Sequence, residues 1–327
     1  IRQWHNVMDA EQHYGILGQY SGTAATTPSL GGSPARWRAL PMVQGGSSGG
    51  SVRGLRLGFD ESFLYAAVEL APGRLGWDTV GVQIAVDTYQ PGTGQHQLPR
   101  TLIQSDIGFE FLIDLISPAE GSLRVTPEYN RHASELDPAS GDDFGRFARR
   151  PVASRNRLDG RFDTMYVITN RARFGRDGTF YRAGRYDRGG LRFGTQAGST
   201  LSDWYIDETA GLLEVRIPWD LLNVTDPSTR TLLWDLHTEG AYGTVKAGDF
   251  HLGVVLYRKD RPTVLDAIPA VNKGRWVAQA FVPWRWQGWS EPRHHGAPKP
   301  VYDSLRLLWR ESSDAERAPL GRRAPSN

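Results

Sequence analysis

Period-two alternation of apolar residues is the feature that most constrains the fold of this chain. Between Gly211 and Pro218, the apolar residues Leu213, Val215 and Ile217 alternate with charged ones. Successive side chains of a strand point to opposite faces of a sheet, so this pattern predicts a strand with an apolar inner face and a polar outer face. Proline cannot donate to a strand ladder, so we expect the strand to end at Pro218 and a short helical turn to follow.

Runs of the same kind recur along the sequence. The expected strands cover residues 55–59 and 64–70 as a hairpin around Asp60, then 80–86, 109–115, 164–169 and 252–257, with another starting at Leu123. Antiparallel strands at such short spacing are typical of sandwiches and jelly rolls. The predicted fold class is therefore all-β: an antiparallel, jelly-roll-like β-sandwich with long loops, short peripheral helices and extended terminal arms.

The composition along the chain predicts one main domain. Residues 49–312 are expected to form a single β-sandwich domain with an arginine-rich insertion at about 131–196. Residues 1–48 contain a Gly-, Ser-, Thr- and Pro-rich stretch and are expected to be an N-terminal arm or linker packed on this body. Residues 313–327 are charged and poor in apolar residues, which predicts a disordered tail.

Composition and motifs narrow the classes of function. The chain has no cysteine, which removes disulfides, thiolate catalysis and thiolate metal sites. Its formal charge is only +2, and no nucleic-acid-binding signature is present, so no nucleic-acid partner is expected. No GxSxG, HExxH or nucleotide-binding glycine motif is found, so these enzyme classes lack their signatures. No apolar run approaches the roughly 20 residues of a membrane-spanning helix, so no transmembrane segment is expected.

Tryptophan is unusually frequent, with 11 in 327 residues. Indole rings stack on the C–H faces of sugars while neighbouring polar side chains bond the hydroxyls, so exposed tryptophans beside polar residues suggest a glycan site. The candidate carbohydrate-binding residues are Trp77, Asp78, Trp204, Trp284, Trp286 and Trp289. For each tryptophan the alternative is packing in the core. That alternative is strongest for Trp219, which closes the predicted strand-to-helix corner.

Three segments together resemble carbohydrate-binding module family 9 and the wider DOMON-like superfamily. They are LRLGFDESFLYAAVEL at 55–70, VGVQIAVDTYQPGTG at 80–94 and GLLEVRIPWDLLNVTDPS at 211–228. The resemblance implies a sandwich in which two aromatic rings enclose a terminal sugar. By order along the chain, Trp77 and Trp204 are the nearest equivalents of those rings.

The same resemblance implies structural calcium, which takes six to eight oxygen ligands. The candidate metal ligands are Asp60, Asp78, Asp87 and Glu110. Some DOMON-like relatives bind haem through a Met and a His. None of the three methionines here stands in a loop facing a well-placed His, so no haem is expected, and no nucleotide either.

A stretch of different character runs from Arg131 to Gln196. It has 14 arginines and no lysine against 8 acidic residues. Arginine without lysine suggests planar contacts to carboxylates, phosphates or aromatic faces. Two alternatives stay open: the arginines pair with local aspartates in long loops, or they form a groove for an acidic polysaccharide or a partner protein. The candidate interaction residues are Arg149, Arg150, Arg171 and Arg173.

The expected function is that of a non-catalytic carbohydrate-binding module within a larger bacterial surface or polysaccharide-processing protein. Its expected partner is a glycan or polysaccharide, with a neighbouring protein or domain as a second possible partner, and its expected place is extracellular, at the cell surface or periplasmic. One alternative is a structural or interaction subunit that docks through Trp- and Arg-rich surfaces. A second alternative is a carbohydrate-active enzyme, for which the sequence does not say which two acids would meet.

Overall fold

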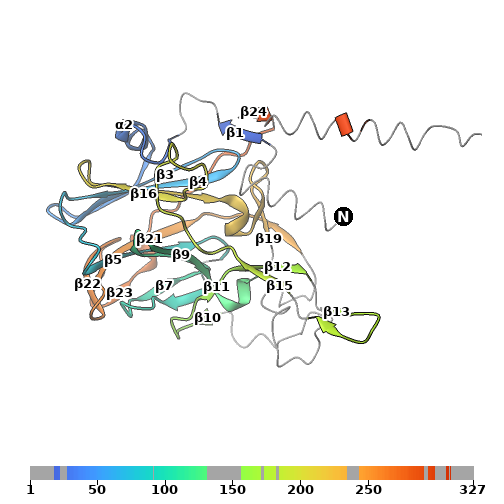
Figure 1. Cartoon of the computed structure of the whole chain (residues 1–327). Coiled ribbons are helices and arrows are strands. Elements are labelled where there is room, and N and C mark those ends of the chain that lie inside the picture. The colour runs from blue at the N-terminus through green and yellow to red at the C-terminus, as the bar shows by residue number, and fades with distance from the viewer. Residues whose placement is uncertain are drawn as a thin grey trace, which may run out of the picture.

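The computed structural model describes residues 18–22, 28–90, 92–130, 156–170, 173–181, 184–233, 243–290 and 294–298, together with 307, 308 and 310. Within them the fold is all-β, as predicted, and Figure 1 shows three sheets stacked in layers. The predicted tail at 313–327 lies outside the described residues, as does much of the predicted N-terminal arm.

The first layer is a five-stranded antiparallel sheet in the order β16-β17-β4-β3-β2. Its strands are β2 (Met42–Gly45), β3 (Val52–Phe59), β4 (Phe63–Leu70), β16 (Trp204–Asp207) and β17 (Leu212–Pro218). The predicted hairpin at 55–70 is confirmed as β3 and β4, which pair in antiparallel register. The strand that ends at Pro218 is confirmed as β17, and the 3-10 turn η4 (Trp219–Leu222) follows it directly.

The second layer is a six-stranded antiparallel sheet in the order β11-β9-β8-β5-β21-β22. Its strands are β5 (Val80–Asp87), β8 (Phe111–Ser117), β9 (Glu120–Val125), β11 (Asp163–Thr164), β21 (His251–Arg258) and β22 (Thr263–Ile268). The two layers enclose the main core, which takes Leu55 and Leu57 from β3, Val82 and Ile84 from β5, and Val215 from β17. Face-to-face packing of two antiparallel sheets is the predicted β-sandwich.

A third layer covers the other face of the six-stranded sheet, and the sequence pattern did not predict it. It holds β6 (Gly94–Gln97), β7 (Gln104–Phe109), β10 (Asn156–Arg157) and β23 (Arg275–Trp276). A second core lies between the layers and includes Ala85, Phe109 and Trp276. Adding a Cβ at Gly253 would place it 2.6 Å from the ring of Trp276, so glycine at this position allows the indole to lie close to the sheet.

The predicted strand at 109–115 was wrong as a single element. The chain forms two strands there, β7 and β8, which belong to different sheets, and Glu110 lies at their junction. Phe109 therefore packs in the second core and Phe111 in the main core. β7 ends and β8 begins with apolar residues, so the alternation of Phe109, Phe111 and Ile113 continues across the junction and hides it.

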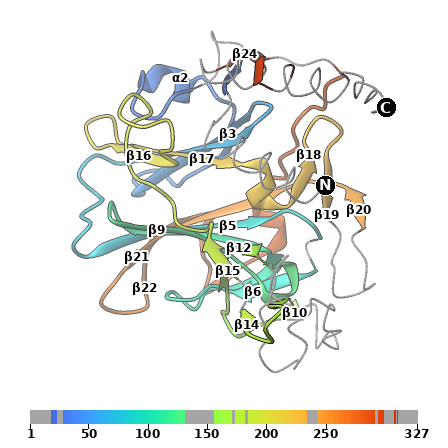
Figure 2. The same cartoon turned by 45° about the vertical axis from the view of Figure 1, so that its right-hand side comes forward.

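Smaller elements surround the three layers, as Figure 2 shows from a second side. They are β1 (Gly18–Gly22), α2 (Pro34–Arg38), η1 (Pro127–Tyr129), β12 (Tyr166–Asn170), β13 (Arg173–Phe174), β14 (Phe180–Tyr181), β15 (Gly184–Asp187), β18 (Val224–Asp226), β19 (Thr231–Leu233), β20 (Thr244–Lys246), η5 (Ala278–Ala280) and β24 (His294–Pro298). Among the described residues, no helix is both long and apolar enough to cross a membrane.

The outward face of the first sheet is covered, contrary to the predicted polar outer face of β17. Trp37 of α2 is fully buried there and packs edge-on against Tyr65, with ring centroids 5.8 Å apart. Glu214 of β17 accepts a hydrogen bond of 2.7 Å from the backbone N–H of Gly31 and is fully buried. Part of the predicted N-terminal arm, the segment from residue 28 to residue 40, therefore supplies a further apolar layer on the sandwich.

Candidate functional site

The eight described tryptophans divide into buried and half-buried rings. The buried ones are Trp37, Trp204, Trp219, Trp276 and Trp286, and the half-buried ones are Trp77, Trp284 and Trp289. Trp219 donates its indole N–H to the carbonyl oxygen of Asp60 at 2.8 Å, which fits the expected closing of the strand-to-helix corner. Only the half-buried rings offer any part of a ring to solvent, so only they are candidates for stacking on a sugar.

Trp77 and Trp204, the two rings that the sequence paired, do lie together. Trp77 is in the loop between β4 and β5, and Trp204 begins β16. Their ring centroids are 5.4 Å apart at an interplanar angle of 64°, an edge-to-face contact. Phe193 contacts Trp204 in the same way at 4.8 Å. The two indoles touch, so a sugar does not lie between them in this arrangement, and Trp204 is fully buried.

Both indole N–H groups of this pair are buried and have no hydrogen-bond partner among the described residues. A buried donor without an acceptor costs about 1–3 kcal/mol, so each is expected to be met by an ordered buried water. Asp78, next to Trp77, is exposed. The ammonium of Lys259 donates to the carbonyl oxygens of Trp77 and Ile116, which fixes the loop to the second sheet. We call Trp77, Asp78, Phe193 and Trp204 the Trp77 site.

The other predicted tryptophans form a separate cluster around Phe59 at the end of β3. Trp289 stacks on Phe59 with centroids 6.1 Å apart and planes at 17°, and Trp284 meets Phe59 edge-on. Trp286 is buried beneath them and donates its indole N–H to the carbonyl oxygen of Pro227 at 2.7 Å. Trp284 and Trp289 keep part of their surface exposed, so this Trp289 cluster is a second surface of the same chemical kind.

The structure brings two of the four candidate metal ligands together. Asp87, at the end of β5, and Glu110 are both buried, and burial raises the pKa of each carboxyl group. Glu110 accepts hydrogen bonds from the backbone N–H of Thr88 at 2.8 Å and from the hydroxyl of Thr93 at 3.0 Å. His251, which the sequence analysis did not single out, lies 2.7 Å from the Asp87 carboxylate through its Nδ1.

The other two candidates are placed differently. Asp60 accepts hydrogen bonds from the backbone N–H groups of Ser62 and Phe63 and from the hydroxyl of Tyr65, all within its own hairpin. Asp78 is exposed in the Trp77 loop. Across the residues that the structure describes, no group of three or more His, Asp or Glu side chains is arranged to hold a metal ion.

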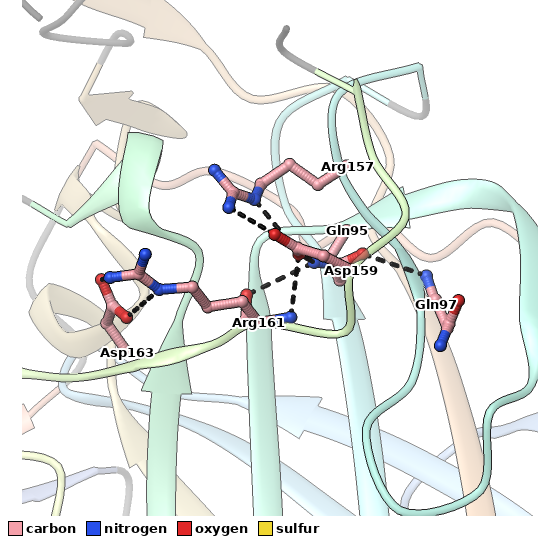
Figure 3. A network of polar contacts seen from close by, with 6 residues as sticks. All are labelled: Gln95, Gln97, Arg157, Asp159, Arg161 and Asp163. Carbon is pink, nitrogen blue, oxygen red and sulfur yellow. Dashed lines mark hydrogen bonds and ion pairs between the residues drawn. The ribbon is translucent and has the colours of Figure 1, made fainter. Parts of the chain in front are cut away.

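Two of the described arginines of the arginine-rich segment pair with local acids, and Arg188 pairs with the distant Asp220. Figure 3 shows Arg157 bonded to Asp159, and Arg161 bonded to Asp163, each two residues further along the chain. Gln95 of β6 also donates to Asp159 at 2.7 Å, which ties this loop to the third layer. These contacts agree with the first alternative, local pairing, for this part of the segment.

The interaction residues proposed from the sequence are only partly described. Arg149, Arg150 and Arg171 lie outside the described residues. Arg173 is in β13, and its guanidinium lies 5.5 Å from the centre of the Tyr181 ring. Arg173 therefore contacts an aromatic face, whereas Arg157 and Arg161 contact carboxylates.

No protein-family model matches this chain, and the comparison with curated proteins finds no match. The placement of the site residues therefore rests on the geometry. Two members of the sites, Phe193 and His251, were missed by the sequence analysis because each is a single residue without a motif, and only the fold brings it to its partners.

Proposed function

We propose that this chain is a non-catalytic carbohydrate-binding β-sandwich that takes a neutral glycan at the Trp77 site. The observation that carries the proposal is the half-buried ring of Trp77, held against Trp204 and standing beside the exposed carboxylate of Asp78. A sugar supplies a C–H face for the exposed part of this ring, and its hydroxyl groups need polar partners at the edge of the ring. Asp78, exposed beside it, supplies a carboxylate that accepts from further hydroxyls.

The buried carboxyl pair does not support the alternative of a glycosidase. Glycosidases hold two carboxyl groups roughly 5–10 Å apart on either side of the scissile bond, within reach of substrate. Asp87 and Glu110 are 0% and 1% exposed, and Glu110 is engaged by backbone and hydroxyl donors. We therefore assign this pair to the structure of the junction between β5, β7 and β8. The function that we propose is binding. We also propose an extracellular, cell-surface or periplasmic location, on the basis of the family resemblance.

Replacing Trp77 with alanine is expected to weaken glycan binding at least tenfold. The indole supplies the stacking face, and its loss removes this contact while the buried Trp204 keeps its place in the core. Retardation in affinity gels containing hydroxyethyl cellulose, xylan, mannan or mixed-linkage β-glucan measures the effect. Trp289→Ala is the matched control, because Trp289 is half-buried at the other tryptophan cluster.

Unchanged retardation of Trp77→Ala together with loss in Trp289→Ala would move the sugar site to the Trp289 cluster. Binding of the parent chain to none of these glycans would contradict the proposal, and the interaction-subunit alternative would then lead.

Calcium remains part of the proposal only at Asp87 and Glu110. A Ca²⁺ ion there would place its charge between two buried carboxylates, but it would need further oxygens from backbone or water to complete its ligands. If it binds, millimolar Ca²⁺ raises the melting temperature relative to EDTA, and Asp87→Asn abolishes the difference, whereas Asp78→Asn retains it. Identical melting curves of the parent chain in Ca²⁺ and EDTA would remove calcium from the proposal.

A further inference from the structure

A small β-hairpin, β13 and β14, carries aromatic and arginine side chains that the main sheets do not cover. In Figure 1 this hairpin, labelled at β13, projects beyond the three layers. Arg173 pairs with Tyr181, and Phe174 with Phe180, in antiparallel register. The turn between them is well defined: the N–H of Gly178 donates to the carbonyl of Gly175 at 3.0 Å, and that of Gly175 to the carbonyl of Thr179 at 2.7 Å.

Three aromatic rings are exposed on this hairpin. Phe174 is 56%, Tyr181 48% and Phe180 37% exposed. Directly opposite residues of a hairpin share a face, so Phe174 and Phe180 form one aromatic face, with ring centroids 5.1 Å apart. Arg173 and Tyr181 form the other face. A projecting element with aromatic residues on both faces is a surface that a partner can use.

The arginines of the hairpin are left without carboxylate partners. Arg173 lies over the Tyr181 ring, and Arg176 is exposed in the turn; neither forms an ion pair with another described residue. The acid beside them, Asp177, is already engaged, because its carboxylate accepts from both the backbone N–H and the hydroxyl of Thr179. The ring of Tyr181 restricts the guanidinium of Arg173, while the N–H donors at its edge stay available for an external anion.

We propose that the hairpin from Arg173 to Tyr181 binds an anionic polysaccharide with carboxylate groups, such as a polyuronate. Between Arg173 and Tyr181 the sequence has two arginines and one aspartate, a net charge of +1, and Thr179 engages that aspartate, so the two guanidinium groups complement such a chain. Guanidinium groups bind carboxylates through two parallel hydrogen bonds, and the aromatic face of Phe174 and Phe180 takes the C–H face of the sugar ring. The proposal deepens the glycan-binding function but places an acidic glycan on a surface of its own, separate from the Trp77 site.

The form of the hairpin favours a polysaccharide over a lipid bilayer. Its turn carries the charged side chains of Arg176 and Asp177, both exposed, so the leading end of the hairpin is polar. Insertion into hydrocarbon would bury these charges, at a high cost in desolvation. A polysaccharide lies along the faces of the hairpin and leaves the turn in water.

The test uses the whole chain and two probes with the same sugar backbone: polygalacturonate, which is charged, and its fully methyl-esterified form, which is neutral. Titration calorimetry at low and at physiological salt measures the affinity. We expect binding to polygalacturonate that weakens with salt, and at least tenfold weaker binding to the ester. The double variant Arg173→Gln and Arg176→Gln should lose at least tenfold, and so should Phe174→Ala with Phe180→Ala. Arg157→Gln is the matched control, because that arginine belongs to the same segment but is paired with Asp159.

Equal losses in Arg157→Gln and in the double arginine variant would overturn the proposal, because the effect would then be general charge. Binding as tight to phosphatidylcholine–phosphatidylglycerol vesicles or to single-stranded oligonucleotides would overturn it as well. The Trp77→Ala variant separates the two proposals: it should keep its affinity for polygalacturonate. If the parent chain binds polygalacturonate but no neutral glycan, the hairpin inference stands and the proposal for the Trp77 site fails. Melting curves confirm that each variant is folded, as expected for exposed side chains.

Discussion

Trp204→Ala is expected to lower the free energy of unfolding by about 3–5 kcal/mol, the range for removing a large aromatic side chain from a core. The ring is fully buried and belongs to the main core between the first two sheets. It also contacts Trp77 and Phe193, at centroid distances of 5.4 and 4.8 Å, so its removal leaves a cavity that two other rings line. Urea unfolding followed by circular dichroism measures the change.

Trp77→Ala is the comparison for this prediction. Trp77 is half-buried and lies in a loop, so its removal should cost clearly less than the removal of Trp204. A loss of under about 1 kcal/mol for Trp204→Ala would show that the ring does not hold the edge strand β16 to the core. In that case Trp204 would return as a candidate for direct sugar contact.

The stability of the chain is expected to fall as the pH rises from about 4 to 8, and Glu214 is a principal cause. Burial raises the pKa of this carboxyl to about 7 from its ordinary value of 4.5. The folded state then holds a proton that the unfolded state releases, so the stabilisation is complete below pH 4.5 and is lost as the pH rises through 7. A shift of this size corresponds to about 3 kcal/mol. Urea unfolding at pH 5, 6, 7 and 8 measures the slope.

Glu214→Gln isolates this contribution. The neutral amide oxygen still accepts from the backbone N–H of Gly31, but no charge forms in the buried site, so the slope should be shallower and the variant should be more stable than the parent at pH 8. Glu208→Gln is the control, since Glu208 is exposed. Asp203, whose pKa burial raises to about 6, contributes a slope of the same sign in both proteins and cancels in the comparison. Equal slopes in the parent and Glu214→Gln would contradict the prediction.

The surroundings of Glu214 show which part of the fold could be predicted from the sequence and which part could not. The alternation around it correctly predicted β17 and the side of the strand that faces the main core. It could not reveal that residues 28–40, which have no periodicity, cover the opposite side with Trp37. Period-two patterns report which face of a strand is apolar, and they do not tell whether another part of the chain covers the polar face.

The third layer was missed for a related physical reason. β6, β10 and β23 are short, and β10 and β23 pair in parallel with strands distant in sequence. Short strands carry too few residues for a periodic signal, and long-range parallel pairing leaves no turn signature. For the candidate site, the family resemblance assigned Trp77 and Trp204 to one sugar site; their rings do touch, but in a way that leaves no room for a sugar between them. Whether each ring is buried depends on contacts such as that of Phe193, which only the fold creates.

Strand β5 is buried along its whole length, from Val80 to Asp87, because it stands between both hydrophobic cores. The main core and the second core therefore cannot unfold one after the other, because the unfolding of either core exposes one face of β5. The described layers should unfold as one cooperative unit, and the amide hydrogens of β5 should exchange with solvent only through global opening. A ligand held at the edge of the sandwich would then be coupled, through this strand, to the stability of the whole molecule.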